Sequence, residues 1–252
     1  FVMLFLGIPI AFTLCLSSIL YLVLYTNIPL IIVAQQLLKG VDSFTLLAIP
    51  FFVIAGCLMQ GGGISRRIVD FARKLVGWIP GGMAVVDIVA SMIFAAMTGA
   101  GAATTAAVGG IMIPYMEEDG YDPGFASAIQ TVGGVFGPII PPSILMIVAA
   151  STAGISIGQA LMAGMVPGIF IGVAFMVYNY IHCKVTGMGE KSSFSAKRLA
   201  KSFISAVPAL MVPVILLTGM YSGIYTPTEG AGIAVAYAVL VSIYVYKRLK
   251  WA

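Results

Sequence analysis

Long runs without a single charged residue are the feature that most restricts how this chain can fold. Residues 1–38, 43–65, 88–116 and 123–183 contain no Asp, Glu, Lys or Arg, and only 9% of the 252 residues are charged. Each run reaches the roughly 20 apolar residues that a helix needs to cross a bilayer. The runs are continuous rather than short and alternating, which disfavours a β-barrel. We therefore expect an all-α polytopic membrane protein in contact with the lipid bilayer.

Two of these runs are interrupted by residues that weaken a helix. The stretch MTGAGAATTAAVGG at 97–110 is rich in glycine, and GGVFGPIIPPS at 133–143 carries both glycine and proline. Non-helical backbone persists at membrane depth only where it is buried in protein or lines a polar cavity. Broken helices then offer carbonyl groups to cations and N–H groups to anions. Sodium favours such neutral oxygen ligands, and hydroxyl groups that would complete the shell belong to Thr98, Thr104, Thr105 and Ser143.

The same glycines have a second interpretation. Gly99, Gly101, Ala103 and Ala107 are small enough to let two helices pack closely without any ligand. The chain would then be a non-transporting membrane scaffold or assembly subunit. The second break, and the length of the segment that contains the first, favour the functional interpretation.

The segment at 83–116 is too long for one membrane crossing and too short for two, which would need about 40 residues plus a turn. The positive-inside rule places the basic clusters at 66–74 and 184–201 in the cytoplasm, so an even number of crossings separates them. Segments at 124–150 and 159–182 supply two. We therefore predict a re-entrant hairpin at 83–116 that turns near Thr98 to Thr105.

An amphipathic helix is predicted between the glycines that precede residue 64 and the glycine at 77. Apolar residues recur there at helical spacing, and basic residues occupy the other positions. Ser65 is the expected N-cap. Such a helix lies along the membrane surface.

Few other residues carry chemistry. Asp87 is expected near the membrane interface, with a proton or ion role as the alternative, and Glu229 is expected to cap the helix after Thr226. The sequence contains no cluster of metal ligands, no nucleophile paired with a base and no phosphate-binding loop, so we expect no enzyme. It also lacks the basic stripe with interleaved aromatic residues that is typical of nucleic-acid binding.

Four long motifs span nearly the whole chain. They are LAIPFFVIAGCLMQGGGISRRIVDFARKLVG (47–77), MTGAGAATTAAVGGIMIP (97–114), GPIIPPSILMIVAASTAGISIGQALMAGMVPG (137–168) and GIYTPTEGAG (223–232). In this order and spacing they resemble the large membrane subunit of tripartite ATP-independent periplasmic (TRAP) transporters, the DctM-like family.

The resemblance implies a permease subunit of the bacterial inner membrane in a sodium-coupled secondary transporter. It implies import of organic acids such as C4-dicarboxylates or sialic acid, with a small membrane subunit and a periplasmic binding protein as partners. No cofactor is implied, only sodium as the coupling ion.

The family's elevator-type fold of two inverted repeats implies a domain plan for this chain. Scaffold transmembrane helices occupy 1–60, and the amphipathic surface helix forms an arm at 61–80. The re-entrant hairpin follows at 83–116, and the broken helix with the next transmembrane helix at 123–183. A cytoplasmic basic loop at 184–201 leads to transmembrane helices at 202–252, which open the second repeat.

The resemblance also implies site residues. Thr98, Gly99 and Thr104 at the hairpin tip and Gly137 in the break form the first sodium site, while Pro142 and Ser143 border the substrate. The family commonly has Ser-Gly-Ser where this chain has Ala100 as the third residue, so that position ligates only through its backbone.

Family members are also longer than these 252 residues. The resemblance implies that a second hairpin, a second sodium site and part of the substrate cavity belong to residues outside these 252. We therefore expect that this polypeptide by itself does not transport.

Overall fold

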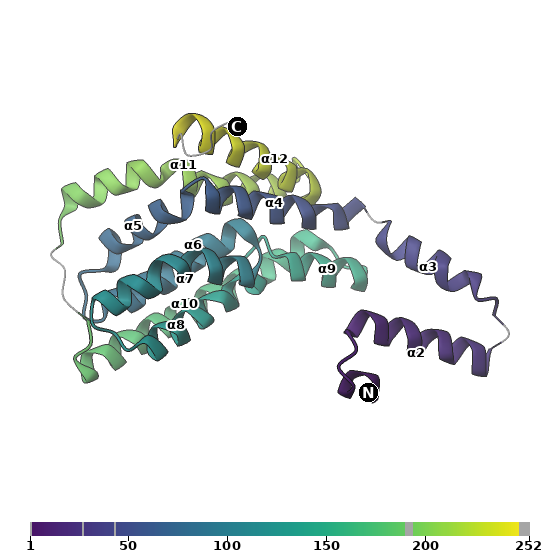
Figure 1. The fold of residues 1–252 in the computed structure, drawn as a ribbon. Helices are drawn as coiled ribbons and strands as arrows, with labels where there is room; N and C mark the ends of the chain where they lie inside the picture. Colours follow the sequence, from purple (N-terminus) through teal and green to yellow (C-terminus); the bar gives the residue numbers. More distant parts are fainter. Residues whose placement is uncertain (1, 27, 43, 190–193, 247–252) are drawn as a thin grey trace. The chain divides into compact units, whose positions relative to one another are not determined.

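All regular structure in the described part of the chain is helical. The computed structural model describes residues 2–26, 28–42, 44–189 and 194–246. The chain divides into two compact units, Phe1–Leu46 and Leu47–Ala252, and each is described by itself (Figure 1). The all-α fold class predicted from the charge-free runs is confirmed.

The first unit consists of short apolar helices. α1 (Val2–Phe5) and α2 (Ile10–Tyr25) are separated by Gly7, which has a φ of 78°, and Pro9. α3 (Ile31–Val41) and the 3-10 turn η1 (Phe44–Leu47) follow. Most large apolar side chains of α2 are exposed. Such exposure is typical of a helix whose partner is lipid or another protein.

The second unit contains the other helices, several of them long enough to span a membrane. Four segments have this length and apolarity: 123–153, Ile157–Thr186, Ala196–Tyr221 and Pro227–Val245. A further pair, α4 with α5, is bent by 69° at its break. The elements are α4 (Ala48–Gly61), α5 (Ile64–Val76), α6 (Gly82–Thr98), α7 (Gly101–Glu118), α8 (Pro123–Ile139), α9 (Ile144–Ala153), α10 (Ile157–Thr186), α11 (Ala196–Tyr221), α12 (Pro227–Leu240) and the π-helical η2 (Val241–Val245).

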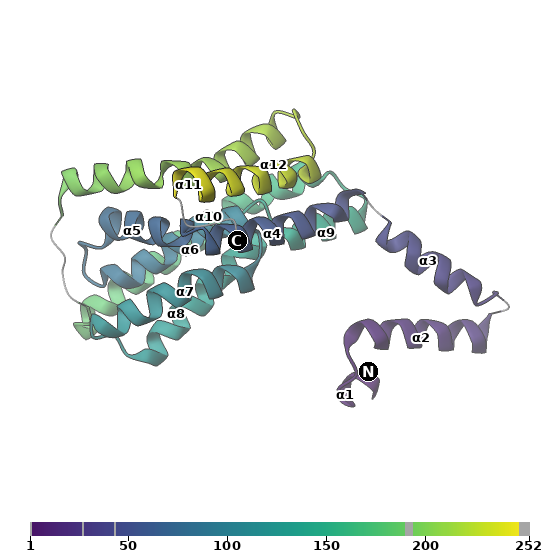
Figure 2. The ribbon, with the colours of Figure 1, turned by 45° about the horizontal axis from the view of Figure 1, so that its top comes forward.

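The core of this unit is built around α6. The helices α7 and α8 pack on each other and on α6, and α10 also contacts α6 (Figures 1 and 2). α12 packs on α4, and α11 packs on α5. Fully buried side chains of this core include Phe94, Met97, Met112 and Phe136. The hairpin and the broken helix thus bury one face of each helix against the other helices of this unit.

The amphipathic segment forms a helix, but it begins two residues earlier than the predicted N-cap implies. α5 starts at Ile64, and its N-cap is Gly63, whose φ of 76° only glycine adopts readily. The expectation that Ser65 is the N-cap is therefore wrong, because the left-handed turn at Gly63 sets the start of the helix. The apolar face of α5, including Ile68 and Ala72, is buried against protein.

Candidate ion-binding site at the hairpin tip

The glycine-rich stretch forms a sharp turn between two packed helices. α6 ends at Thr98, Gly99 has a φ of 62°, Ala100 is extended, and α7 begins at Gly101. The positive φ requires glycine at position 99. A Cβ atom there would also collide with the carbonyl oxygen of Pro142. The turn that the sequence predicted between positions 98 and 105 therefore lies at 99 and 100.

The second break lies between α8 and α9. α8 continues to Ile139, and α9 begins at Ile144 with Ser143 as its N-cap. The expectation that Gly137 lies in the break is thus wrong: it is the third residue from the end of α8. The helix continues this far because Pro138 removes one helical hydrogen bond only, and the N–H of Ile140 still donates to the carbonyl of Phe136 at 2.7 Å.

The two prolines of the break leave carbonyl groups without their helical donors. Pro141 and Pro142 have no N–H, and they stand four residues after Gly137 and Pro138. The carbonyl of Pro138 accepts a hydrogen bond from Ser143 Oγ at 2.7 Å instead. Ser143 Oγ also accepts from the N–H of Met146 at 3.2 Å. The carbonyl of Gly137 has no donor at its i+4 position.

The hairpin tip docks directly on this break. The N–H of Ile144 donates to the carbonyl of Gly99 at 3.1 Å. A Cβ atom on Gly137 would collide with the backbone of Gly101, and one on Gly101 would lie 2.6 Å from the carbonyl oxygen of Gly134. These glycines therefore permit a backbone-to-backbone approach of α7 and α8. The helix-packing interpretation of the glycines is correct for Gly101, and the packing itself assembles the site.

Two threonine hydroxyls face each other at the tip. Thr98 Oγ1 lies 3.2 Å from the carbonyl oxygen of Phe94, its acceptor, and 3.3 Å from Thr104 Oγ1. Thr104 Oγ1 donates to the carbonyl of Ala100 at 3.0 Å. Both side chains, like that of Ser143, are at most 1% exposed. The tip thus gathers neutral oxygens in a buried place.

Four helix ends converge at this point. α6 and α8 end here, and the last carbonyl groups of a helix lack intrahelical donors. α7 and α9 begin here, and their first N–H groups carry the positive end of the helix dipole. Carbonyl and hydroxyl oxygens suit a small hard cation, and free N–H groups suit a carboxylate. All six predicted residues, Thr98, Gly99, Thr104, Gly137, Pro142 and Ser143, lie at or beside this junction.

Sequence reasoning missed one element of the site. α4 covers the tip, since a Cβ atom on Gly56 would lie 3.1 Å from Thr98 Cγ2. Gly56 stands alone in an apolar helix, so its sequence context carried no signal. The carbonyl of Gly137, by contrast, could be predicted from the sequence to lack its helical donor. Its donor would be the N–H of the residue four positions later, and that residue is Pro141, which has none.

Asp87 is enclosed by protein near the start of α6. Its side chain is fully buried, and neither carboxylate oxygen has a hydrogen-bond partner among the described residues. Ser91, one turn later on α6, and Gln130 on α8 are also buried with side-chain atoms that lack partners there. Burial follows from the helices that enclose α6, and the expected depth of Asp87 near the membrane interface stays a prediction.

Glu229 caps α12, as predicted. Its Oε2 accepts from the N–H of Thr226 at 2.7 Å, and its own N–H donates to Thr226 Oγ1 at 3.4 Å. This reciprocal arrangement is a capping box.

Comparison with known proteins gives a consistent result over the full length of the chain. The profile of the family described as tripartite ATP-independent periplasmic transporter, DctM component, matches residues 1–252. An isethionate TRAP transporter permease protein, DctMQ, of Oleidesulfovibrio alaskensis is 42% identical over 97% of this chain and 39% of its own length.

Two further relatives show the same pattern. The C4-dicarboxylate TRAP transporter large permease protein DctM of Vibrio cholerae is 38% identical over 98% of this chain and 55% of its own length. The sialic acid TRAP transporter large permease protein SiaM of the same organism is 37% identical over 98% of this chain and 58% of its own length. The chain thus spans about two-fifths to three-fifths of the length of these relatives.

Proposed function

The chain belongs to the DctM component family of TRAP transporters, and from that premise we propose that it is part of a sodium-coupled permease that imports organic acids. It is a multi-pass protein of the bacterial inner membrane. The relatives carry the names of transport permeases, in agreement with the expectation that this chain is not an enzyme.

The observation that carries the proposal is the convergence of two interrupted helix pairs on one buried cluster of neutral oxygens. A transporter needs a site in which an ion sheds its water, and helix ends at membrane depth supply ligands without a buried charge. In a scaffold subunit, the glycines alone would account for the packing. Nothing in packing, however, requires Thr98 and Thr104 to face each other beside a carbonyl without its helical donor.

The residues at the tip fit a sodium ion. The hydroxyl oxygens of Thr98 and Thr104 and the carbonyl groups of Gly99 and Gly137 would hold it. The two hydroxyls and the Gly99 carbonyl each have a lone pair beyond the hydrogen bond they make, and the Gly137 carbonyl has no helical donor. Ala100 contributes only its backbone. When bound, sodium supplies a positive charge that favours an anionic substrate nearby.

The substrate side of the junction is built from the N-termini of α7 and α9. The first N–H groups of α7 attract a carboxylate, whereas at α9 the N–H groups of Ile144 and Met146 are already bonded and the dipole of the helix contributes instead. Pro142 and Ser143 border the place where the carboxylate would lie. The named substrates of the relatives, C4-dicarboxylate, sialic acid and isethionate, are organic anions. An organic acid is therefore the proposed substrate class.

We place the chain in a three-component system with a small membrane subunit and a periplasmic binding protein. The hairpin enters the membrane from the cytoplasm and does not cross it, and its tip moves with the broken helix in an elevator-like step. Transport requires the longer protein, because these 252 residues span only part of its relatives.

Uptake by proteoliposomes that contain the full-length protein and its partners tests this proposal. We expect uptake to require an inward sodium gradient. Thr98→Val should raise the sodium concentration needed for half-maximal uptake about tenfold, because a charge-assisted contact is lost. Thr131→Val is the matched control, since the exposed Thr131 hydroxyl donates only to the carbonyl of Ser127.

Two results would contradict the proposal. Uptake that is unchanged without a sodium gradient would remove the coupling ion. A protein that assembles with its partners but supports no uptake under any gradient would favour the non-transporting scaffold.

A further inference from the structure

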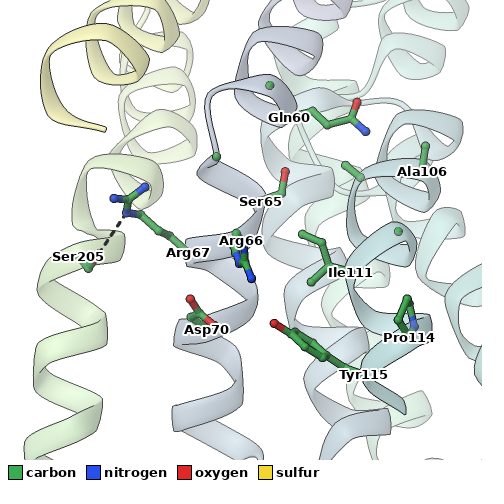
Figure 3. A pocket seen from close by; sticks show the side chains of 14 residues that line it. Gln60, Ser65, Arg66, Arg67, Asp70, Ala106, Ile111, Pro114, Tyr115 and Ser205 are labelled. Atoms are coloured by element: carbon green, nitrogen blue, oxygen red, sulfur yellow. Dashed lines mark hydrogen bonds between the residues drawn. The ribbon is translucent and has the colours of Figure 1, made fainter. Parts of the chain in front are cut away.

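A cavity of about 790 Å³ lies between the α4–α5 bend, α7 and α11, and it shares no residue with the hairpin tip (Figure 3). Its volume is in the range of sites that bind small molecules. The polar side chains that line it are those of Gln60, Ser65, Arg66, Arg67, Asp70 and Ser205, together with Tyr115.

The N-terminus of α5 opens on this cavity. α5 has 13 residues, and its N-cap, Gly63, provides no side chain to satisfy the first N–H groups. These N–H groups and the positive end of the helix dipole form an incomplete anion site. The side chains around the start of the helix complete this site.

Ser65 is the second observation. Its side chain is 3% exposed, its Oγ has no hydrogen-bond partner among the described residues, and it lines the cavity. A buried hydroxyl without a partner costs about 1–3 kcal/mol. An oxygen atom of a ligand in the cavity would accept its hydrogen bond.

Two arginines supply charge. Arg67 is held in place, because its Nε donates to Ser205 Oγ at 3.2 Å and its guanidinium lies 3.7 Å from the centre of the Tyr246 ring (Figure 3 shows the first contact). Arg66 is exposed and forms no ion pair or hydrogen bond with the described residues. Asp70 is the one acidic residue in the lining. A planar guanidinium suits bidentate recognition of phosphate or carboxylate.

A second cavity, of about 440 Å³, adjoins the first along α5 and α11. It shares Arg67, Asp70 and Ser205 with the first cavity, and the further residues that line it are Lys74, Arg198, Lys201 and Ser202. We call the two cavities together the basic groove. Five cationic side chains line it against the single carboxylate of Asp70.

Apolar side chains lie close to the basic groove on α11. Phe203 and Ile204, directly before Ser205, are 48% and 71% exposed. A groove that is strongly basic and has exposed apolar neighbours matches both parts of a phospholipid: the phosphate and the acyl chains. A soluble oxyanion would use only the first part.

We propose that the basic groove binds the phosphate of an anionic phospholipid, with the acyl chains along α11. Ser65, Arg66 and the N-terminus of α5 hold the phosphate, and Arg67 is positioned for it by Ser205 and Tyr246. The basic clusters of α5 and α11 belong to the cytoplasmic side by the positive-inside rule, where anionic headgroups attract such clusters. The bound lipid fastens the α5 arm to α11, and this role does not depend on which ion or substrate the hairpin takes.

The test uses the full-length protein in detergent with added phosphatidylglycerol, or phosphatidylcholine with the same acyl chains. The thermal midpoint should rise more with phosphatidylglycerol. Native mass spectrometry should show about tenfold weaker phosphatidylglycerol binding for Ser65→Ala and Arg66→Gln, because each removes one contact to a charged group. Without lipid, Ser65→Ala should unfold at the wild-type midpoint or above it, since its hydroxyl has no partner to lose.

Lys184→Gln is the matched control, because it removes one positive charge from α10, outside the basic groove. It should keep the full phosphatidylglycerol response. Equal responses to both lipids, or a full response in Ser65→Ala and Arg66→Gln, would overturn the proposal. A response to inorganic phosphate or to an organic acid that abolishes lipid binding would assign the pocket to a soluble oxyanion and also overturn it.

Discussion

Two places in the molecule interrupt a helix, and their polar groups have different surroundings. At the hairpin tip the polar groups face one another, and the glycines let the backbones approach closely. At the α4–α5 bend the polar groups face a cavity lined by arginines. The tip has Thr98, Thr104 and Ser143 almost fully buried. The bend has exposed Arg66 and half-buried Arg67. Both places interrupt apolar helices with glycine.

The difference follows from the cost of burying charge. A full charge at the tip would have to be desolvated, which is expensive without a partner, whereas neutral oxygens can be buried when they bond to one another. At the bend, the guanidinium groups keep access to water through an open cavity. A closed neutral site suits a small dehydrated cation, and an open basic site suits a large anion.

The largest loss of stability is expected at Gly137, where the backbones of α7 and α8 are in direct contact. Gly137→Ala should lower the free energy of unfolding by about 3 kcal/mol, the upper end for overpacking, because its Cβ would collide with the backbone of Gly101. Thermal unfolding in detergent measures this. Gly232→Ala on α12, where a Cβ meets nothing within 4 Å, is the control and should be neutral or stabilising. Equal midpoints for the two variants would show that the tip is loosely packed.

Asp87→Asn tests whether the carboxylate buried near the start of α6, about 16 Å along the helix from Thr98, takes part in ion binding. Removing a buried carboxylate without a partner should raise the free energy of unfolding by about 2 kcal/mol near neutral pH, with the sodium response of uptake retained. Asp122→Ala is the contrasting control. It removes the N-cap that accepts from the N–H of Phe125 at 2.9 Å, so it should destabilise by about 1 kcal/mol. A lost sodium response in Asp87→Asn would place a ligand outside the neutral cluster.

Thr98→Val separates stability from ion binding at the tip. Thr104 Oγ1 keeps its bond to the carbonyl of Ala100, so the loss in free energy of unfolding should be about 1 kcal/mol. Sodium should stabilise the wild-type protein more than this variant in a thermal unfolding series. If sodium shifts both midpoints equally, the threonine pair is structural only.

The smallest loss of stability is expected at the bend between α4 and α5. Gly62→Ala places a Cβ against Ser242 Oγ, which can rotate away, and 2.7 Å from Ser242 Cβ, which cannot, so the two helices must move apart slightly. The cost should be about 1 kcal/mol, the lower end for overpacking. Gly61→Ala, with nothing within 4 Å of its Cβ, is the neighbouring control and should change the midpoint little. If Gly62→Ala lowers the free energy of unfolding as much as Gly137→Ala does, the two helix interruptions do not differ in how tightly they are packed.

Several features could be predicted because they depend on local chemistry. The hairpin turn follows from glycine at 99, and the capping box follows from Thr226 and Glu229 at their spacing. The start of α5 and the end of α8 were misplaced by a few residues, because a left-handed glycine and a tolerated proline move helix ends. The environment of Asp87 was missed because burial depends on which helices surround α6.

The sequence by itself determined that this chain is an apolar helical membrane protein that resembles the DctM family, with helix breaks between residues 98 and 105 and between residues 133 and 143. Composition and local backbone preferences are properties of short segments, so they can be read without a fold. Only the tertiary structure decided that the two breaks meet, with Ile144 bonded to Gly99. It alone also decided that Ser65, Arg66 and Arg67 line one cavity with Ser205 of α11. These contacts join residues far apart in the chain, and long-range packing sets them.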